Sequence, residues 1–317
     1  MLGTKYGVPY YFLLPMQDII GDVHGHATQL KALLDKLGYE RKNGAYRHPE
    51  RTVLFLGDYI DRGPDNPETL RIVREMVDAG TAIALMGNHE YNALAFNTLR
   101  EDGKGYLRPH LIKNFKQHGE TLLQFQNRQA EYDEYVAWFK TLPLFYENEH
   151  FRAVHASWHQ PSIEHLQDVL TDDTTLSDAA LQASAVPDSY TMDAVEKVLK
   201  GVELPLPAGR SFLDKDKNER YHIRYKWWEN PVGASYEQLS VLPGLDLSGF
   251  TYVDESGHYY DENQKPVFFG HYWLRGEPNL YRGNVCCLDY SVAKGGVLVA
   301  YRYGGERALS PSQLVWV

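Results

Sequence analysis

Short apolar segments that run directly into polar residues recur three times in the first 90 residues, as "MQDIIGDVHGH", "RTVLFLGD" and "TAIALMGNHE". The first two are each followed by an amphipathic segment with helical spacing, which ends at Gly38 and at Gly80. Strands that alternate with helices in this way predict parallel β-α-β units with right-handed crossovers, and therefore an α/β fold. The C-terminal ends of such strands lie at one edge of the sheet, which is where open α/β sheets bind ligands.

The rest of the chain predicts additions to this framework. Residues 103–141 lack strand patterns and predict a helical insertion, and residues 160–209 predict a surface insertion or lid with one amphipathic helix near "TMDAVEKVLKG". The C-terminal third, with "YHIRYKWW", "PVFFGHYW", "NVCCLDYS", "GGVLVAYRY" and "SQLVWV", predicts antiparallel strands separated by Gly and Asn turns. We expect a single domain over residues 16–317, preceded by an extension or non-native leader over residues 1–15.

Composition narrows the classes of partner. The formal net charge of −10 argues against an extended nucleic-acid-binding surface, and no apolar run is long enough to predict a membrane helix. The only two cysteines, Cys286 and Cys287, are adjacent, a spacing poorly suited to a disulfide. We therefore expect a cytoplasmic protein.

Polar residues at the strand ends form a set with the chemistry of metal ligands. A lone histidine at a strand end is usually structural, but this set combines carboxylate, amide and imidazole groups without a thiolate. Such donors suit Mn, Fe, Zn or Ni rather than a closed structural zinc site. A carboxylate on the middle strand, such as Asp58, could bridge two cations about 3.5–4 Å apart. The candidate ligands are Asp22, His24, Asp58, Asn88, His155 and His271.

Five ordered motifs, "GDVHGH", "GDYIDRGP", "GNHE", "RAVHAS" and "FGHYW", resemble the signature blocks of the calcineurin-like metallophosphoesterases. The "GDYIDRGP" form is most similar to the branch that holds the serine/threonine phosphoprotein phosphatases and the diadenosine tetraphosphatases. The blocks extend from residue 21 to about residue 273, and so cover most of the chain. This resemblance implies a layered α/β sandwich with two central mixed β-sheets flanked by helices.

The resemblance also implies roles for these residues. Asp22, His24 and Asp58 would hold one metal ion, and Asp58, Asn88, His155 and His271 would hold a second. The ions would be divalent transition metals, with manganese expected first, and a bridging hydroxide would attack phosphorus. His89 would protonate the leaving oxygen, Asp61 would orient His89, and Arg62 would bind a phosphate oxygen.

Two departures from the family pattern affect the expected substrate. Met86 stands where the protein phosphatases carry a phosphate-binding arginine, and Ser157 replaces a glycine, followed by Trp158 and His159. We therefore expect a small phosphorylated molecule or nucleotide, with dinucleoside polyphosphates included. The alternatives are a serine/threonine phosphoprotein phosphatase and a non-catalytic, metal-binding regulatory module.

For several charged residues, the sequence allows both a functional and a structural role. Arg224 or Lys226 could supply the phosphate contact that Met86 cannot, or could belong to the solvated face of a half-buried strand. Asp61 and Arg62 could form only a loop ion pair, although their proximity to Asp58 favours a functional role. We expect structural roles for His26 and His159.

Overall fold

The computed structural model describes residues 16–213, 219–241, 247, 249–252 and 259–317. The predicted leader over residues 1–15 lies outside this range and stays a prediction. Within the described residues, no helix has the length and apolar character needed to cross a membrane.

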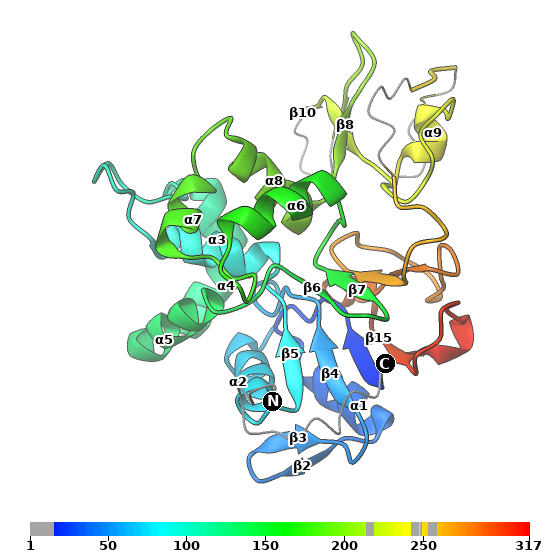
Figure 1. Cartoon of the computed structure of the whole chain (residues 1–317). Helices are drawn as coiled ribbons and strands as arrows, with labels where there is room; N and C mark the ends of the chain where they lie inside the picture. The colour runs from blue at the N-terminus through cyan, green and yellow to red at the C-terminus, as the bar shows by residue number, and fades with distance from the viewer. Residues whose placement is uncertain (1–15, 214–218, 242–246, 248, 253–258) are drawn as a thin grey trace, which may run out of the picture.

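Two mixed β-sheets lie at the centre of the molecule (Figure 1). The larger sheet has the order β14-β15-β1-β4-β5, with β16 paired to β15. Its strands are β1 (Gln17–Ile20), β4 (Thr52–Phe55), β5 (Ala82–Ala84), β14 (Asp289–Tyr290), β15 (Val297–Tyr303) and β16 (Leu314–Trp316). The smaller sheet has the order β13-β12-β7-β6, with strands β6 (Phe145–Glu147), β7 (Arg152–Val154), β12 (Val267–Phe269) and β13 (Val285–Cys287). The predicted sandwich with two mixed sheets is confirmed.

Three two-stranded ladders and the helices complete the described part of the chain. The ladders pair β2 (Glu40–Lys42) with β3 (Ala45–Arg47), β8 (Glu203–Pro205) with β11 (His222–Arg224), and β9 (Phe212–Leu213) with β10 (Glu219–Arg220). The helices are α1 (Ala27–Leu37), α2 (Asn66–Asp78), α3 (Asn88–Asn97), α4 (Ile112–Gln124), α5 (Gln129–Phe139), α6 (Gln160–Val169), α7 (Asp178–Ala183), α8 (Tyr190–Lys200) and α9 (Tyr236–Leu239), with 3₁₀ turns η1 (Val292–Lys294) and η2 (Pro311–Gln313). Figure 1 shows α3 to α8 gathered on one side, in cyan to green.

The β-α-β framework follows the sequence pattern. β1 pairs with β4 and β4 with β5, all in parallel, so their C-terminal ends share one edge. Helix α1 buries its leucines at positions 30, 33, 34 and 37 and ends at Gly38, whose φ of 90° is the left-handed conformation of a C-cap. Helix α2 begins where Asp65 accepts a hydrogen bond from the Glu68 amide.

The antiparallel prediction for the C-terminal third is correct for part of it and wrong for β12 and β13. β14, β15 and β16 are antiparallel, whereas β12 pairs in parallel with both β7 and β13. The residues of β12 and β13 are all buried, and a fully buried strand carries no alternation from which its direction could be inferred.

Two further expectations need correction. Residues 160–209 contain three helices rather than one, and Val195, Val198 and Leu199 of α8 belong to the main hydrophobic core. In "YHIRYKWW", the strand ends at Arg224 and the chain then turns. Arg224 and Lys226 therefore do not share one face of a continuous strand, and Trp228 is fully buried.

Candidate metal centre

Loops at the C-terminal ends of five strands converge on one site. Asp22 and His24 follow β1, Asp58 follows β4, and Asn88 opens α3 after β5. His155 follows β7 in the second sheet, and His271 follows the parallel strand β12. The parallel pairing of β7 and β12, which the sequence pattern did not predict, places these two histidines at the same edge.

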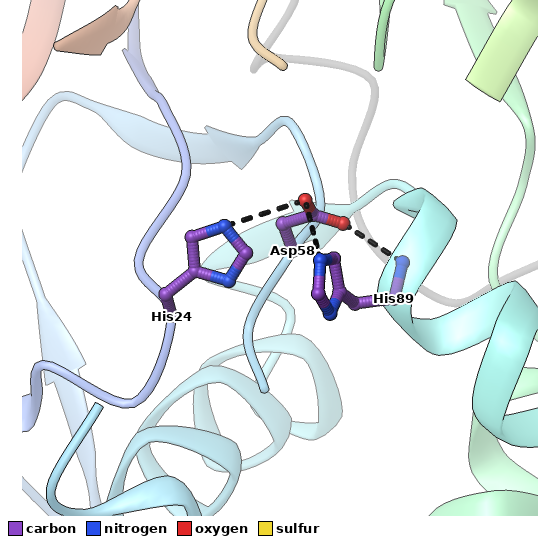
Figure 2. A group of neighbouring side chains, drawn as sticks. All are labelled: His24, Asp58 and His89. Carbon is purple, nitrogen blue, oxygen red and sulfur yellow. Dashed lines mark hydrogen bonds and ion pairs between the residues drawn. The ribbon is translucent and has the colours of Figure 1, made fainter. Parts of the chain in front are cut away.

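Asp58 lies between two groups of histidines. Its Oδ2 is 3.5 Å from His24 Nε2 and 3.9 Å from His89 Nε2, and Figure 2 shows the carboxylate between these two imidazoles. Its Oδ1 is 3.4 Å from His155 Nε2 and accepts a hydrogen bond from the His89 backbone amide at 3.0 Å. The geometry gives one sub-site formed by His24, Asp58 and His89 and a second formed by Asp58, His155 and His271, which share Asp58.

Asn88 and Asp22 lie beside the second group. Asn88 Oδ1 is 3.1 Å from His155 Nε2 and 2.8 Å from His271 Nδ1. Both oxygens of Asp22 accept from the His271 backbone amide, at 3.2 and 3.1 Å. The structure thus brings all six predicted metal ligands together, all of them buried.

The chemistry of the donors fits divalent cations. Nδ1 of His24 donates to the Ile60 carbonyl and Nδ1 of His155 donates to the Leu56 carbonyl, which turns the Nε2 of each ring towards the Asp58 carboxylate. Within the part of the chain that the structure describes, Nε2 of His24 and Nε2 of His271 are buried without a hydrogen-bond partner, an arrangement that is costly unless another ligand binds them. Two metal ions would give these nitrogens and the Asp58 oxygens their partners.

Electrostatics support the same conclusion. Burial lowers the pKa of His24 to about 3 and holds the pKa of His271 well below its ordinary value, so both rings are neutral, as metal ligation requires. Burial opposes charge on His155 as well, but the Asp58 carboxylate raises the pKa of this ring to about 10. A pocket that favours a proton this strongly also favours a cation.

The loops that carry these residues adopt unusual backbone conformations. Among the described residues, six of the ten non-glycine residues with positive φ lie here: His24, Asp58, Asp61, Arg62, His271 and Trp273. Such conformations cost on the order of 1–3 kcal/mol each and persist where surrounding structure enforces them, commonly at functional sites. Glycine is required next to them, because a Cβ on Gly270 would lie 2.0 Å from Asp22 Oδ1 and one on Gly87 2.3 Å from Asp58 Oδ1.

Glu90 holds two of these loops together. Its Oε2 accepts from the amides of Asp58 and Gly87, and its Oε1 accepts from the amides of Tyr59 and Ile60. The fully buried carboxylate thereby fixes the ends of β4 and β5 relative to each other.

His89, Asp61 and Arg62 lie beside the shared carboxylate. His89 Nδ1 is 2.5 Å from Asp61 Oδ2, and Arg62 Nη2 is 3.4 Å from His89 Nε2. The Arg62 guanidinium lies 3.8 Å from the centroid of the Trp273 ring. His89 therefore presents Nε2, and not Nδ1, to the centre of the site.

A family model described as calcineurin-like phosphoesterase matches residues 18–271, which include every candidate ligand. The chain belongs to the calcineurin-like phosphoesterases. The predicted resemblance is thus confirmed at the level of the family.

Two curated relatives and one solved structure agree with this assignment. The asymmetrical bis(5'-nucleosyl)-tetraphosphatase PrpE of Halalkalibacterium halodurans is 53% identical over 73 residues, which is 23% of this chain and only 30% of the relative. The symmetrical bis(5'-nucleosyl)-tetraphosphatase of Marinomonas sp. (strain MWYL1) is 26% identical over 92% of this chain and 95% of its own. A cold-active protein-tyrosine phosphatase from a psychrophilic Shewanella species shares the fold, with a TM-score of 0.50, 19% identity, and coverage of 92% of this chain and 76% of that one.

The two basic residues predicted to bind substrate, Arg224 and Lys226, differ in their position relative to the candidate metal centre. Arg224 of this calcineurin-like phosphoesterase lies beside the centre, with its Nη1 3.5 Å from the His271 carbonyl oxygen. Lys226 Nζ instead donates to the Gln238 carbonyl, outside the cluster of ligands. Of the two, Arg224 is the one that contacts a candidate ligand residue.

The residues that depart from the family pattern do not reach into the centre. Met86 is fully buried in the main core. The Ser157 hydroxyl donates to the Lys197 carbonyl of α8. His26 and His159 contact groups within their own turns, the carbonyls of Val23 and His24 for the former and the Ser162 hydroxyl for the latter.

Three contributors to the site were missed by sequence reasoning. Glu90 stands in the quoted "GNHE" motif, so its position was known but its role was not. His118 and Thr121 both bond Asp61 from the predicted helical insertion, where only a buried face made of polar residues could have signalled them. Trp273 belongs to the quoted "FGHYW" motif and contacts Arg62.

Proposed function

We propose that this calcineurin-like phosphoesterase hydrolyses phosphoric esters with two divalent transition-metal ions, and that its substrates are nucleotides such as dinucleoside polyphosphates. The observation that carries the proposal is the placement of His89. Asp61 bonds its Nδ1 at 2.5 Å, while its Nε2 faces the shared Asp58 carboxylate and the Arg62 guanidinium. A proton donor and a phosphate-binding cation thus stand beside one candidate two-metal site.

We propose the ligand sets Asp22, His24 and Asp58 for one ion, and Asp58, Asn88, His155 and His271 for the other. His89 also lies within reach of the first ion, but we assign its Nε2 to proton donation and give its place in the ligand set to Asp22. Bound ions of this kind polarise phosphoryl oxygens and lower the pKa of water towards neutrality. Manganese is proposed first, because the donors are oxygen and imidazole nitrogen without a thiolate.

Residues of the chain would then donate the proton and bind the phosphoryl group. Burial opposes charge on His89, but Asp58 and the bond to Asp61 raise the pKa of this imidazole, so it is a competent proton donor to a leaving oxygen. Because Asp61 accepts from Nδ1, the mobile proton sits on Nε2. Arg62 would bind the non-bridging oxygens of the phosphoryl group.

The relatives support the choice of substrate. Both tetraphosphatases carry names that specify bis(5'-nucleosyl) tetraphosphates, and the symmetrical one aligns along nearly the whole chain. Arg62, Arg224 and Lys294 supply positive charge near the centre, since Lys294 and Arg62 both contact the Trp273 ring. A polyphosphate needs several such charges, whereas a phosphoserine needs one phosphate site.

The alternatives receive less support. A phosphoprotein phosphatase would be expected to carry an arginine at position 86, where Met86 is buried in the core. A non-catalytic regulatory module would have no need for the complete His89, Asp61 and Arg62 set. The free, buried thiols of Cys286 and Cys287 are typical of a reducing compartment, and we propose the cytoplasm.

The test compares kcat/KM for diadenosine tetraphosphate and for a phosphoserine peptide on one manganese-loaded preparation. We expect the dinucleotide to be the better substrate. Arg224→Ala should raise its KM roughly tenfold to a hundredfold, because a hydrogen bond to a charged group contributes about 1.5–3 kcal/mol. Lys226→Ala is the matched control and should change little. Preferred cleavage of the phosphopeptide would contradict the proposed substrate class.

A further inference from the structure

Helix α4 has an inverted distribution of polar and apolar residues. Its buried residues are Asn114, His118 and Thr121, all polar and spaced as one helical face, whereas Ile112 and Leu123 are exposed. A surface helix normally buries its apolar face. The buried polar face must therefore satisfy polar groups elsewhere.

Those groups belong to the loop that carries Asp61. His118 Nδ1 is 2.8 Å from Asp61 Oδ1, and the Thr121 hydroxyl donates to the same oxygen at 2.6 Å. The Thr121 oxygen in turn accepts from the Asp61 backbone amide at 3.0 Å. Gln124, one turn further, donates to the Gly63 carbonyl at 2.9 Å. Helix α4 thus fixes both the carboxylate and the backbone around Asp61.

The hydrogen bonds continue beyond His118 to residues of α5 and α3. His118 Nε2 is 2.7 Å from the Tyr132 hydroxyl, and Asn97 Nδ2 donates to that hydroxyl at 2.8 Å. Asn97 Nδ2 also donates to the Ala93 carbonyl, which fixes its amide orientation. The Tyr132 oxygen accepts from Asn97, and its own proton remains available to His118 Nε2.

The Asp61 carboxylate determines which nitrogen of His118 donates to it. An ionised carboxylate can only accept, so His118 carries a proton on Nδ1 and donates it to Asp61 Oδ1, which leaves Nε2 to the Tyr132 hydroxyl. Both Asp61 oxygens then accept, Oδ1 from α4 and Oδ2 from His89 Nδ1. The carboxylate cannot turn, and the mobile proton of His89 stays on Nε2.

We propose that His118 is a positioning residue for the His89–Asp61 pair, supported by Thr121 and Tyr132. The segment at residues 103–141 then has a role: α4 (Ile112–Gln124) and α5 (Gln129–Phe139) supply the buried donors that orient the proton donor of the reaction. This inference rests on the proposed function, in which His89 protonates the leaving oxygen.

Two substitutions separate positioning from packing. His118→Leu removes the donor to Asp61, whereas His118→Asn keeps an N–H close to the place of Nδ1 in a smaller side chain. We expect His118→Leu to lower kcat for phenyl phosphate, a poor leaving group, by roughly 10–100-fold, with metal content and KM unchanged. Dinitrophenyl phosphate needs little protonation and should lose much less. His118→Asn should restore most of the phenyl phosphate rate.

Equal losses for the two esters, or a His118→Asn variant no better than His118→Leu, would overturn the inference. A second measurement does not depend on turnover. In zinc-loaded protein, the imidazole ¹⁵N resonances of His118 should report a proton on Nδ1, and a ring protonated on Nε2 alone would overturn the proposal. If the wild type hydrolyses neither ester, the proposed function fails, while the resonances still decide the orientation of His118.

Discussion

Three buried carboxylates fix the geometry of this site. Asp58 is shared by both candidate sub-sites, Asp61 is held on both oxygens, and Glu90 accepts four backbone amides. Each is surrounded by donors that leave it a single orientation. The positive φ values of Asp58 and Asp61 show that the backbone, too, is fixed at these residues.

Glu90→Gln tests this view of the loops. An amide can accept on one side only, so its NH₂ group would face two of the four backbone amides, each left unsatisfied at about 1–3 kcal/mol. We expect a lower melting temperature and metal affinity weakened roughly 10–100-fold, because both ligand-bearing loops loosen. Calorimetry and metal titration measure both effects. Glu134→Gln, on the exposed face of α5, is the matched control, and a Glu90→Gln variant as stable as this control would contradict the role.

The sequence identified candidate site residues where a short motif contains them. The six candidate ligands, His89, Asp61 and Arg62 could be named from the sequence because their motifs give both residue type and order, and the structure places them close together. Glu90, His118 and Thr121 could not be identified from the sequence, because their contacts are with backbone amides or a carboxylate that lie next to them only in the folded chain. Arg224 and Lys226 could not be separated, since the chain turns after the strand that was expected to hold both.

At the scale of elements, β1 has different roles at its two ends. Its C-terminal end delivers Asp22 and His24, while near its start the fully buried Asp18 accepts from Arg51 and Tyr39 at 3.0 Å and from Arg302 at 3.3 Å. The parallel direction of β12, which the sequence pattern did not predict, brings His271 to the site. Local pattern established the parallel β1-β4-β5 core but could not orient short, fully buried strands.

Asp18→Asn should destabilise the fold without changing the metal centre. The substitution leaves the buried Arg51 without its main counter-charge, a loss of about 3–5 kcal/mol in the free energy of unfolding. Denaturant titration measures the loss, and the metal content of the folded variant should remain that of the wild type. Asp35→Asn on the exposed face of α1 should stay within about 0.5 kcal/mol of wild type. Equal stability of the two variants would show that the Asp18 cluster contributes nothing.

At the scale of the whole molecule, the two sheets serve one site together. The larger sheet brings Asp22, His24, Asp58 and Asn88, and the smaller sheet brings His155 and His271. Neither sheet alone supplies both sub-sites, so the ligand set exists only when the sheets are packed. Family motifs predicted this joint arrangement, whereas α6 and α7 and the contribution of α8 to the core were not recognisable from composition.

The most direct test of the account is elemental analysis of the purified protein, combined with hydrolysis of an aryl phosphate before and after chelation. We predict about two transition-metal ions per chain, as a shared-carboxylate centre requires, with hydrolysis lost on chelation and restored by manganese. Asp58→Asn should lower the metal content and abolish most of the activity, because Asp58 belongs to both sub-sites. Protein free of metal that hydrolyses the ester at an undiminished rate would contradict the account.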